Sequence, residues 1–71
     1  MTAAEFKALL RHHQLRYVDA AWLMGRHERV IKAWANGESP VPRAAALVMH
    51  ALNERKISPA WCLKKIKEPP P

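Results

Sequence analysis

Apolar side chains recur at intervals of three and four residues in five stretches of the chain, and glycines and prolines separate these stretches. Such spacing is typical of amphipathic α-helices, and no stretch alternates in the way that a half-buried strand does. The separating segments are Gly25, Asn36-Gly37, Ser39-Pro40-Val41-Pro42, Ser58-Pro59 and the Pro69-Pro70-Pro71 tail. The pattern predicts an all-α fold of five short helices in a single domain.

The first two predicted helices have clear local signals at their ends. Thr2 and Glu5 have the spacing of a capping box, so the first helix is expected to begin after Thr2 and to run to about His13. Residues 18–24 predict a helix of two turns. Gly25 follows directly and can adopt the left-handed conformation that ends a helix.

The third predicted helix, residues 28–35, is amphipathic and ends at Asn36-Gly37. Its apolar side carries Val30, Ile31 and Trp34. Arg29 and Lys32 fall on the opposite side, which we therefore expect to be basic. A tryptophan at this spacing predicts a core residue.

Prolines mark the start of the last two predicted helices. Pro42 suits the first turn of the fourth helix, because its missing N–H would be unpaired there in any case. A broad apolar stripe then predicts that this helix is the central member of the core: Ala44, Ala45, Leu47, Val48, Ala51 and Leu52. Ser58-Pro59 gives the same signal for a fifth helix over about 58–66. The domain is expected to span residues 1–67, with 68–71 as a disordered proline tail.

Length and composition exclude several classes of protein. With 71 residues the chain buries only roughly 60% of its unfolded surface, which leaves little room for a substrate cavity, so we expect no enzymatic activity. The one cysteine, Cys62, is expected to be a small buried hydrophobe, and the four histidines include no pair four residues apart on a helix. We therefore expect no metal and no cofactor. The longest apolar run, residues 44–49, is too short to span a membrane, and a cytoplasmic location is expected.

Charge and the arrangement of the second and third helices indicate a nucleic-acid partner. The net charge is +6, which suits a polyanion. Residues 17–36 have the pattern of a helix-turn-helix, in which the second helix enters the major groove of DNA. Ala21 is small enough for the two helices to approach closely, and Met24 is expected to point inward with the apolar side of the third helix.

Residues 4–66 resemble the small Cro/repressor-like helix-turn-helix regulators, also called the XRE family. The matching stretches are Phe6-Lys7-Ala8-Leu9-Leu10, Ala20-Ala21-Trp22-Leu23-Met24-Gly25, Arg29-Val30-Ile31-Lys32-Ala33-Trp34-Ala35-Asn36-Gly37, Pro40-Val41-Pro42-Arg43-Ala44-Ala45-Ala46-Leu47 and Ile57-Ser58-Pro59-Ala60-Trp61. The resemblance implies a five-helix lambda-repressor-like domain that binds palindromic operators as a homodimer. It also implies a repressor of the kind found in phages, prophages and mobile elements, acting in a bacterial or phage-infected cell at the nucleoid.

The chain departs from the family pattern at three positions around the turn. Tyr17 stands where the family usually has a phosphate-binding glutamine, and its hydroxyl is expected to take that role. Arg26 stands where an apolar residue is usual. His27 stands where serine or threonine usually caps the second helix of the motif.

The motif predicts three groups of functional residues. Side chains near the start of the third helix are expected to read base edges: His27, Glu28, Arg29 and Lys32. Side chains at helix starts, in the turn and in the following loop are expected to contact phosphates: Arg16, Tyr17, Arg26, Asn36 and Arg43. Apolar side chains in and before the fifth helix are expected to form the dimer interface: Ile57, Trp61, Leu63 and Ile66.

Several alternatives stay open at this point. Two other functions compete with that of a homodimeric repressor. One is an antitoxin that binds both its own promoter and a toxin, and the other is a protein-interaction module on the same fold. Trp22 either packs on the first helix or contacts a partner. Lys64, Lys65 and Lys67 either contact phosphate or only solvate the fifth helix.

Overall fold

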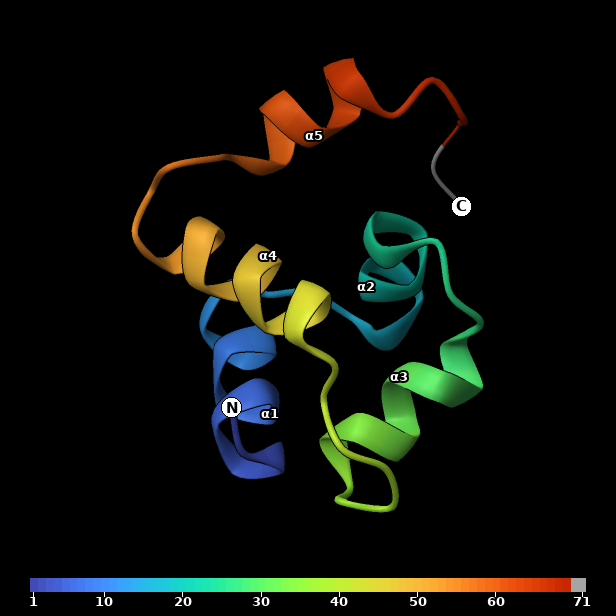
Figure 1. Ribbon diagram of the computed structural model, residues 1–71. Helices are drawn as coiled ribbons and strands as arrows, with labels where there is room; N and C mark the ends of the chain where they lie inside the picture. Colours follow the sequence, from blue (N-terminus) through green and yellow to red (C-terminus); the bar gives the residue numbers. More distant parts are fainter. Residues whose placement is uncertain (70–71) are drawn as a thin grey trace.

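The computed structural model describes residues 1–69, and within that range it contains five α-helices and no strand (Figure 1). The helices are α1 (Ala3–His12), α2 (Tyr17–Met24), α3 (Glu28–Ala35), α4 (Arg43–Asn53) and α5 (Pro59–Lys65). The predicted all-α class is confirmed, and the helix boundaries agree with the predicted ones to within about two residues.

Local hydrogen bonds explain where α1 and α5 begin. The Thr2 hydroxyl oxygen accepts from the Glu5 backbone N–H at 3.1 Å, and a Glu5 carboxylate oxygen accepts from the Thr2 backbone N–H at 3.4 Å, which completes the predicted capping box. At α5, the Ser58 hydroxyl accepts from the Trp61 backbone N–H at 3.1 Å. Pro42 directly precedes α4 as its N-cap, one position earlier than expected.

Residues in the left-handed conformation follow four of the helices, among them Gly37 after α3 with φ +77°. Gly25 has φ +64° and ends α2, and a Cβ built at this position would meet no atom within 4 Å. The backbone conformation, rather than crowding, is therefore what favours glycine here. Gln14 and Arg55 adopt similar φ values, +55° and +59°, just after α1 and α4.

The core is shared by residues of α1, α2, α3 and α4, with Ala20 and Ala21 as the contribution of α2. Phe6, Ile31 and Met49 are its largest fully buried side chains. Trp34 is also buried, as predicted, and meets the Phe6 ring edge to face with ring centroids 5.9 Å apart. The most extensive packing between helices is that of α2 against α3, followed by α1 against α3 and α1 against α4. The prediction that the fourth helix is the central member of the core is therefore wrong.

The apolar stripe of α4 is narrower than predicted. Ala45, Met49 and Leu52 are buried, with the spacing of a single helix face. Ala44 is exposed, and Leu47 has 67% of its surface exposed. Leu47 lies two residues after Ala45, which places it about 200° away around the helix axis. The prediction that Ala44 and Leu47 belong to the core stripe is wrong, because the sequence pattern does not show how few neighbours α4 has.

The last helix is attached to the rest of the molecule by a small contact. Cys62 is the buried residue of α5, and Ile57 packs partly against the core. Figure 1 shows α5 on the opposite side of the molecule from α3, with α2 and α4 between them. Pro70 and Pro71, the end of the predicted disordered tail, lie outside the described residues. None of the helices among residues 1–69 combines the length and the apolar character needed to cross a membrane.

Candidate functional site

An ion pair fixes the start of α2. The Asp19 carboxylate accepts from the Arg16 backbone N–H at 2.9 Å, from Arg16 Nε at 3.0 Å and from Arg16 Nη2 at 2.8 Å. The hydrogen bonds from the Arg16 side chain hold the pKa of the Asp19 carboxyl below its ordinary value. Arg16, predicted to contact phosphate, therefore also closes the first turn of α2.

A histidine caps α3. His27 Nδ1 accepts from the Arg29 backbone N–H at 3.1 Å, so the predicted cap position of His27 is confirmed. One side of α3 is buried through Ile31, Trp34 and Ala35. The opposite side of the helix is left exposed, and its position is set by the packing of the buried side.

The exposed side of α3 forms a shallow hollow of about 360 Å³, here called the α3 face. The residues that line it are His27, Glu28, Arg29, Lys32, Asn36 and Glu38. The structure thus brings together all four predicted base-reading residues and Asn36, which was predicted to contact phosphate. The α3 face holds two cationic and two acidic side chains, so it lacks the basic excess that was expected of this side of the helix. Glu38, in the loop after α3, also lines this face and was not among the predicted residues.

The other two predicted phosphate-binding arginines lie around the motif. Arg26 is exposed in the turn, and its guanidinium carbon lies 6.0 Å from the centre of the Trp34 ring, within the range of a cation–π contact. Arg43 is exposed at the first residue of α4.

A second hollow, of about 460 Å³, lies between α1 and the start of α2 and is here called the basic hollow. Its lining consists of Lys7, Leu10, Arg11, Leu15, Arg16, Tyr17, Val18 and Glu28. Arg16 and Tyr17 were predicted as phosphate ligands, whereas Lys7 and Arg11 were not. The sequence does contain a signal for a shared role of Lys7 and Arg11, because their spacing of four residues places both on one side of α1.

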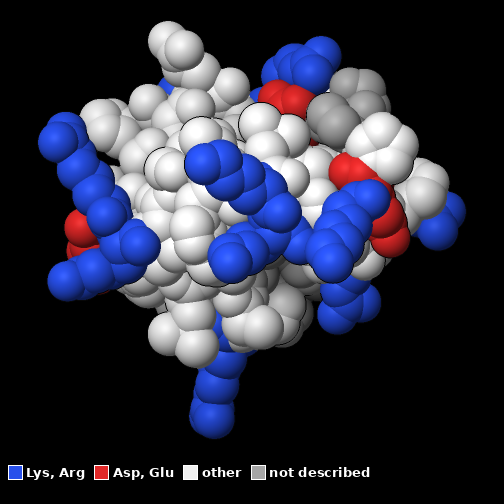
Figure 2. Space-filling model, turned by 90° about the horizontal axis from the view of Figure 1, so that it is seen from above, with Lys and Arg blue, Asp and Glu red and all other residues white. Residues whose placement is uncertain are grey.

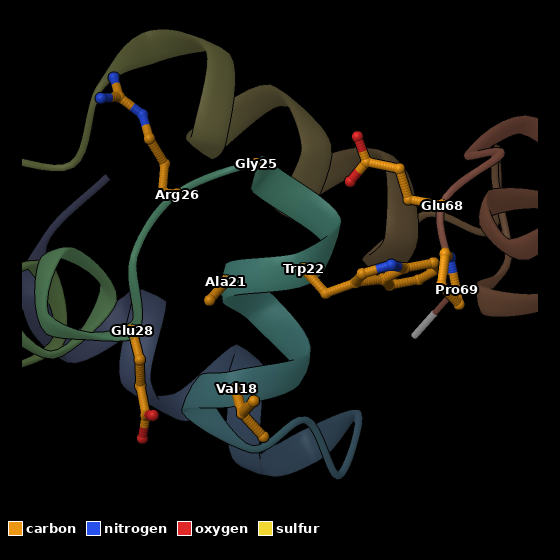
Figure 3. Close-up of a pocket in the computed structure, with 8 residues that line it drawn as sticks. All are labelled: Val18, Ala21, Trp22, Gly25, Arg26, Glu28, Glu68 and Pro69. Atoms are coloured by element: carbon orange, nitrogen blue, oxygen red, sulfur yellow. The ribbon is translucent and has the colours of Figure 1, made fainter. Parts of the chain in front are cut away.

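Trp22 faces the C-terminal segment of the chain. Trp22, Glu68 and Pro69 are among the residues that line a third hollow, beside the turn. In Figure 3 the Trp22 ring extends toward Pro69, whereas Arg26 and Glu28 lie on the other side of α2. The Trp22 indole nitrogen is buried without a hydrogen-bond partner among residues 1–69. Trp22 is thus half-buried and extends toward the C-terminal segment, and its contact with a partner stays a prediction.

The four predicted dimer residues do not share one side of α5. Trp61 and Leu63 have 47% and 50% of their surface exposed, but residues two apart lie about 200° apart around a helix. Ile57 and Ile66 are half-buried. Lys65 Nζ lies 5.9 Å from the Trp61 ring centre. Figure 2, viewed from the α5 side, shows Lys and Arg side chains across the middle of this surface and acidic ones toward its edges.

Cys62 and the histidines form no cluster of metal ligands. No group of three or more His, Cys, Asp or Glu side chains suited to a metal ion occurs in the described part of the chain. Cys62 is a free, buried thiol, and burial raises its pKa. The thiol therefore stays protonated and weakly reactive at neutral pH.

No family model matches the chain, and no match is found among curated proteins or among solved structures.

Proposed function

We propose that the protein is a sequence-specific double-stranded DNA-binding transcriptional regulator, a repressor that binds a palindromic operator as a homodimer. The observation that carries the proposal is the α3 face. Arg29 and Lys32 offer hydrogen-bond donors there, Glu28 offers an acceptor, and Asn36 offers both. Base edges in the major groove are distinguished by their patterns of donors and acceptors, so a mixed surface suits reading better than a purely cationic one.

The arrangement of α2 and α3 supports this use of α3. Gly25 allows a tight turn, and the buried Ile31 and Trp34 hold α3 against the core with its opposite side free. A helix held in this way can enter the major groove, as the second helix of a helix-turn-helix does. The five-helix order and the capped, exposed α3 support the proposal of a lambda-repressor-like domain of the XRE type.

A second copy of the chain would supply the second half-site. One recognition helix contacts too few base pairs to select a single site in a genome, and pairing of two small domains overcomes this limit. The exposed Trp61 is the side chain that we propose for the contact, because Leu63 lies about 200° away around α5. The position of α5, away from α3, leaves the α3 face of each copy free. Because α5 lies away from α3, we interpret the lysines of this region as solvating residues rather than phosphate contacts: Lys64, Lys65 and Lys67.

Selection of bound sites from random duplexes tests the proposal, with a palindrome as the expected result. Arg29→Ala should then weaken operator binding by about 1–3 kcal/mol and relax preference at one base pair of each half-site. Lys56→Ala is a matched control, because Lys56 is exposed and lies between α4 and α5. Recovery of no preferred sequence, or equal losses for both variants on every duplex, would contradict sequence-specific reading by α3.

A protein partner is the second candidate, as in an antitoxin. The observation that favours it is the exposed Leu47 on α4, which the core does not use. If a partner covers α4, Leu47→Asp should abolish capture of that partner while leaving operator binding unchanged. An unchanged complex would exclude α4 as the contact.

A further inference from the structure

The α3 face has no excess of positive charge with which to bind the phosphates of the DNA backbone. The cations Arg29 and Lys32 are accompanied there by Glu28 and Glu38, so these side chains add no net positive charge. Affinity for DNA depends chiefly on cations that displace counterions from phosphates. The attraction for the backbone must therefore come from side chains beside the α3 face.

The basic hollow has the positive charge that the α3 face lacks. Three cations line it, Lys7, Arg11 and Arg16, against one carboxylate, Glu28. The guanidinium of Arg16 is bound to Asp19. Lys7 and Arg11 form no ion pair with any residue among 1–69, so their charges are free for an outside anion. Lys7 is half-buried and Arg11 is exposed.

The donor groups of the basic hollow fit a phosphodiester. A guanidinium can donate two parallel hydrogen bonds to phosphate oxygens, and an ammonium acts as a point charge. The half-buried Tyr17 supplies a neutral hydroxyl donor from the first residue of α2. The apolar part of the lining, including Leu10 and Leu15, gives an anion in the hollow less competition from water than on an open surface.

The basic hollow adjoins the α3 face. Glu28, the first residue of α3, lines both. A phosphate bound by α1 would therefore lie beside the end of α3 that carries Arg29. The two DNA strands flank the major groove, so cations beside a helix that enters the groove are suitably placed for a backbone phosphate.

We propose that Lys7 and Arg11, with Tyr17, bind one phosphate of the DNA backbone next to the groove that α3 enters. The proposal rests on the DNA-binding function proposed above and adds α1 to the interface. In this arrangement Lys7 and Arg11 position the protein on the duplex without reading sequence.

Binding measured as a function of salt tests the proposal with a Lys7→Gln/Arg11→Gln double variant. Because the two cations share one phosphate, the double variant should reduce the slope of log affinity against log salt by about one unit. Affinity should fall equally for operator and random duplexes. Tyr17→Phe should weaken both about tenfold without changing the slope, because it removes a neutral donor to a charged group.

Lys64→Gln/Lys67→Gln is the matched control, since it removes the same charge from the C-terminal region on the α5 side. Thermal unfolding of each variant checks that the fold is retained. An unchanged slope in the Lys7/Arg11 variant, with Arg29→Ala still impaired, would overturn the phosphate proposal and leave the DNA-reading function standing. An altered slope with an unimpaired Arg29→Ala would support the phosphate site and count against reading by α3. A chain that binds no duplex would overturn both.

Discussion

At the scale of single residues, the Arg16–Asp19 pair shows how this chain begins a helix without a conventional cap. Serine, threonine, asparagine and aspartate are the usual N-cap residues, and Arg16 is none of these. The Asp19 carboxylate instead accepts both the backbone and side-chain N–H groups of Arg16. Because Tyr17 is the next residue, this pair also determines how the start of α2 is presented beside the basic hollow.

Asp19→Asn should make this contribution measurable through its pH dependence. The folded-state pKa of Asp19 is depressed, so its ionised form stabilises the fold above the unfolded pKa of about 3.9 and the benefit is lost as pH falls below that value. The variant should melt a few degrees below the wild type at neutral pH, and the difference should shrink near pH 3. Circular dichroism measures both. Glu38→Gln, at an exposed loop position, serves as the control, and a pH-independent difference would contradict the assigned role.

Residue-scale signals were predictable where they are local and of a familiar type. The spacing of Thr2 and Glu5 was enough to predict the capping box, and Ser58-Pro59 was enough for α5. The Arg16–Asp19 cap was not predictable in the same way, because arginine has no general preference for that position. Gln14 and Arg55 in left-handed conformations carry no sequence signal, since glycine or asparagine is the usual residue there.

At the scale of elements, α3 depends on a histidine for its first turn. His27→Ala removes the Nδ1 acceptor for the Arg29 backbone N–H and should destabilise the protein by about 1 kcal/mol. His27→Asn should restore most of the loss, because asparagine is a good N-cap. His50→Ala on the exposed side of α4 is the control. Denaturant unfolding measures the differences, and equal losses for alanine and asparagine would show that the cap is not the reason for the effect.

The helices themselves followed from the sequence, whereas their shared surfaces did not. Periodicity and Gly or Pro separators predict each helix from its own residues. Whether Leu47 is buried depends on what lies over α4, and whether Lys7 lies near Tyr17 depends on how the fold places α1 relative to the start of α2. The basic hollow and the position of Trp22 therefore required the tertiary structure, while the grouping of residues 27–32 on the α3 face followed from one helix.

At the scale of the whole molecule, the proposed DNA surface and the proposed dimer surface lie on different sides and respond differently to salt. DNA binding should weaken as salt rises, because counterion release loses its entropy gain. Pairing through α5 should strengthen, because Lys64 and Lys65 of the two copies repel one another at low salt. Sedimentation at about 0.05 M and about 0.5 M salt tests this prediction. A dimer that dissociates as salt rises would contradict it.

Trp61→Ala complements the salt experiment by removing the largest exposed apolar side chain of α5. It should convert the dimer to a monomer and abolish cooperative operator binding while the helical content is retained. Leu47→Ala, at an exposed position on α4, is the matched control. A wild-type chain that sediments as a monomer at tens of micromolar, and binds one half-site as well as a palindrome, would contradict the homodimer proposal.

The buried thiol of Cys62 allows the opening of α5 to be measured as a rate of chemical labelling, with no engineered probe. Cys62 is the one cysteine of the sequence and the residue that α5 buries, so a thiol reagent can reach it only when α5 swings away from the core. The labelling rate of the native protein should therefore report how often α5 opens, and it should fall as the concentration of protein rises if pairing holds α5 closed. Labelling as fast as that of the unfolded chain would mean that α5 is open most of the time. The reaction rate of Cys62 thus measures how often the small contact between α5 and the rest of the molecule opens.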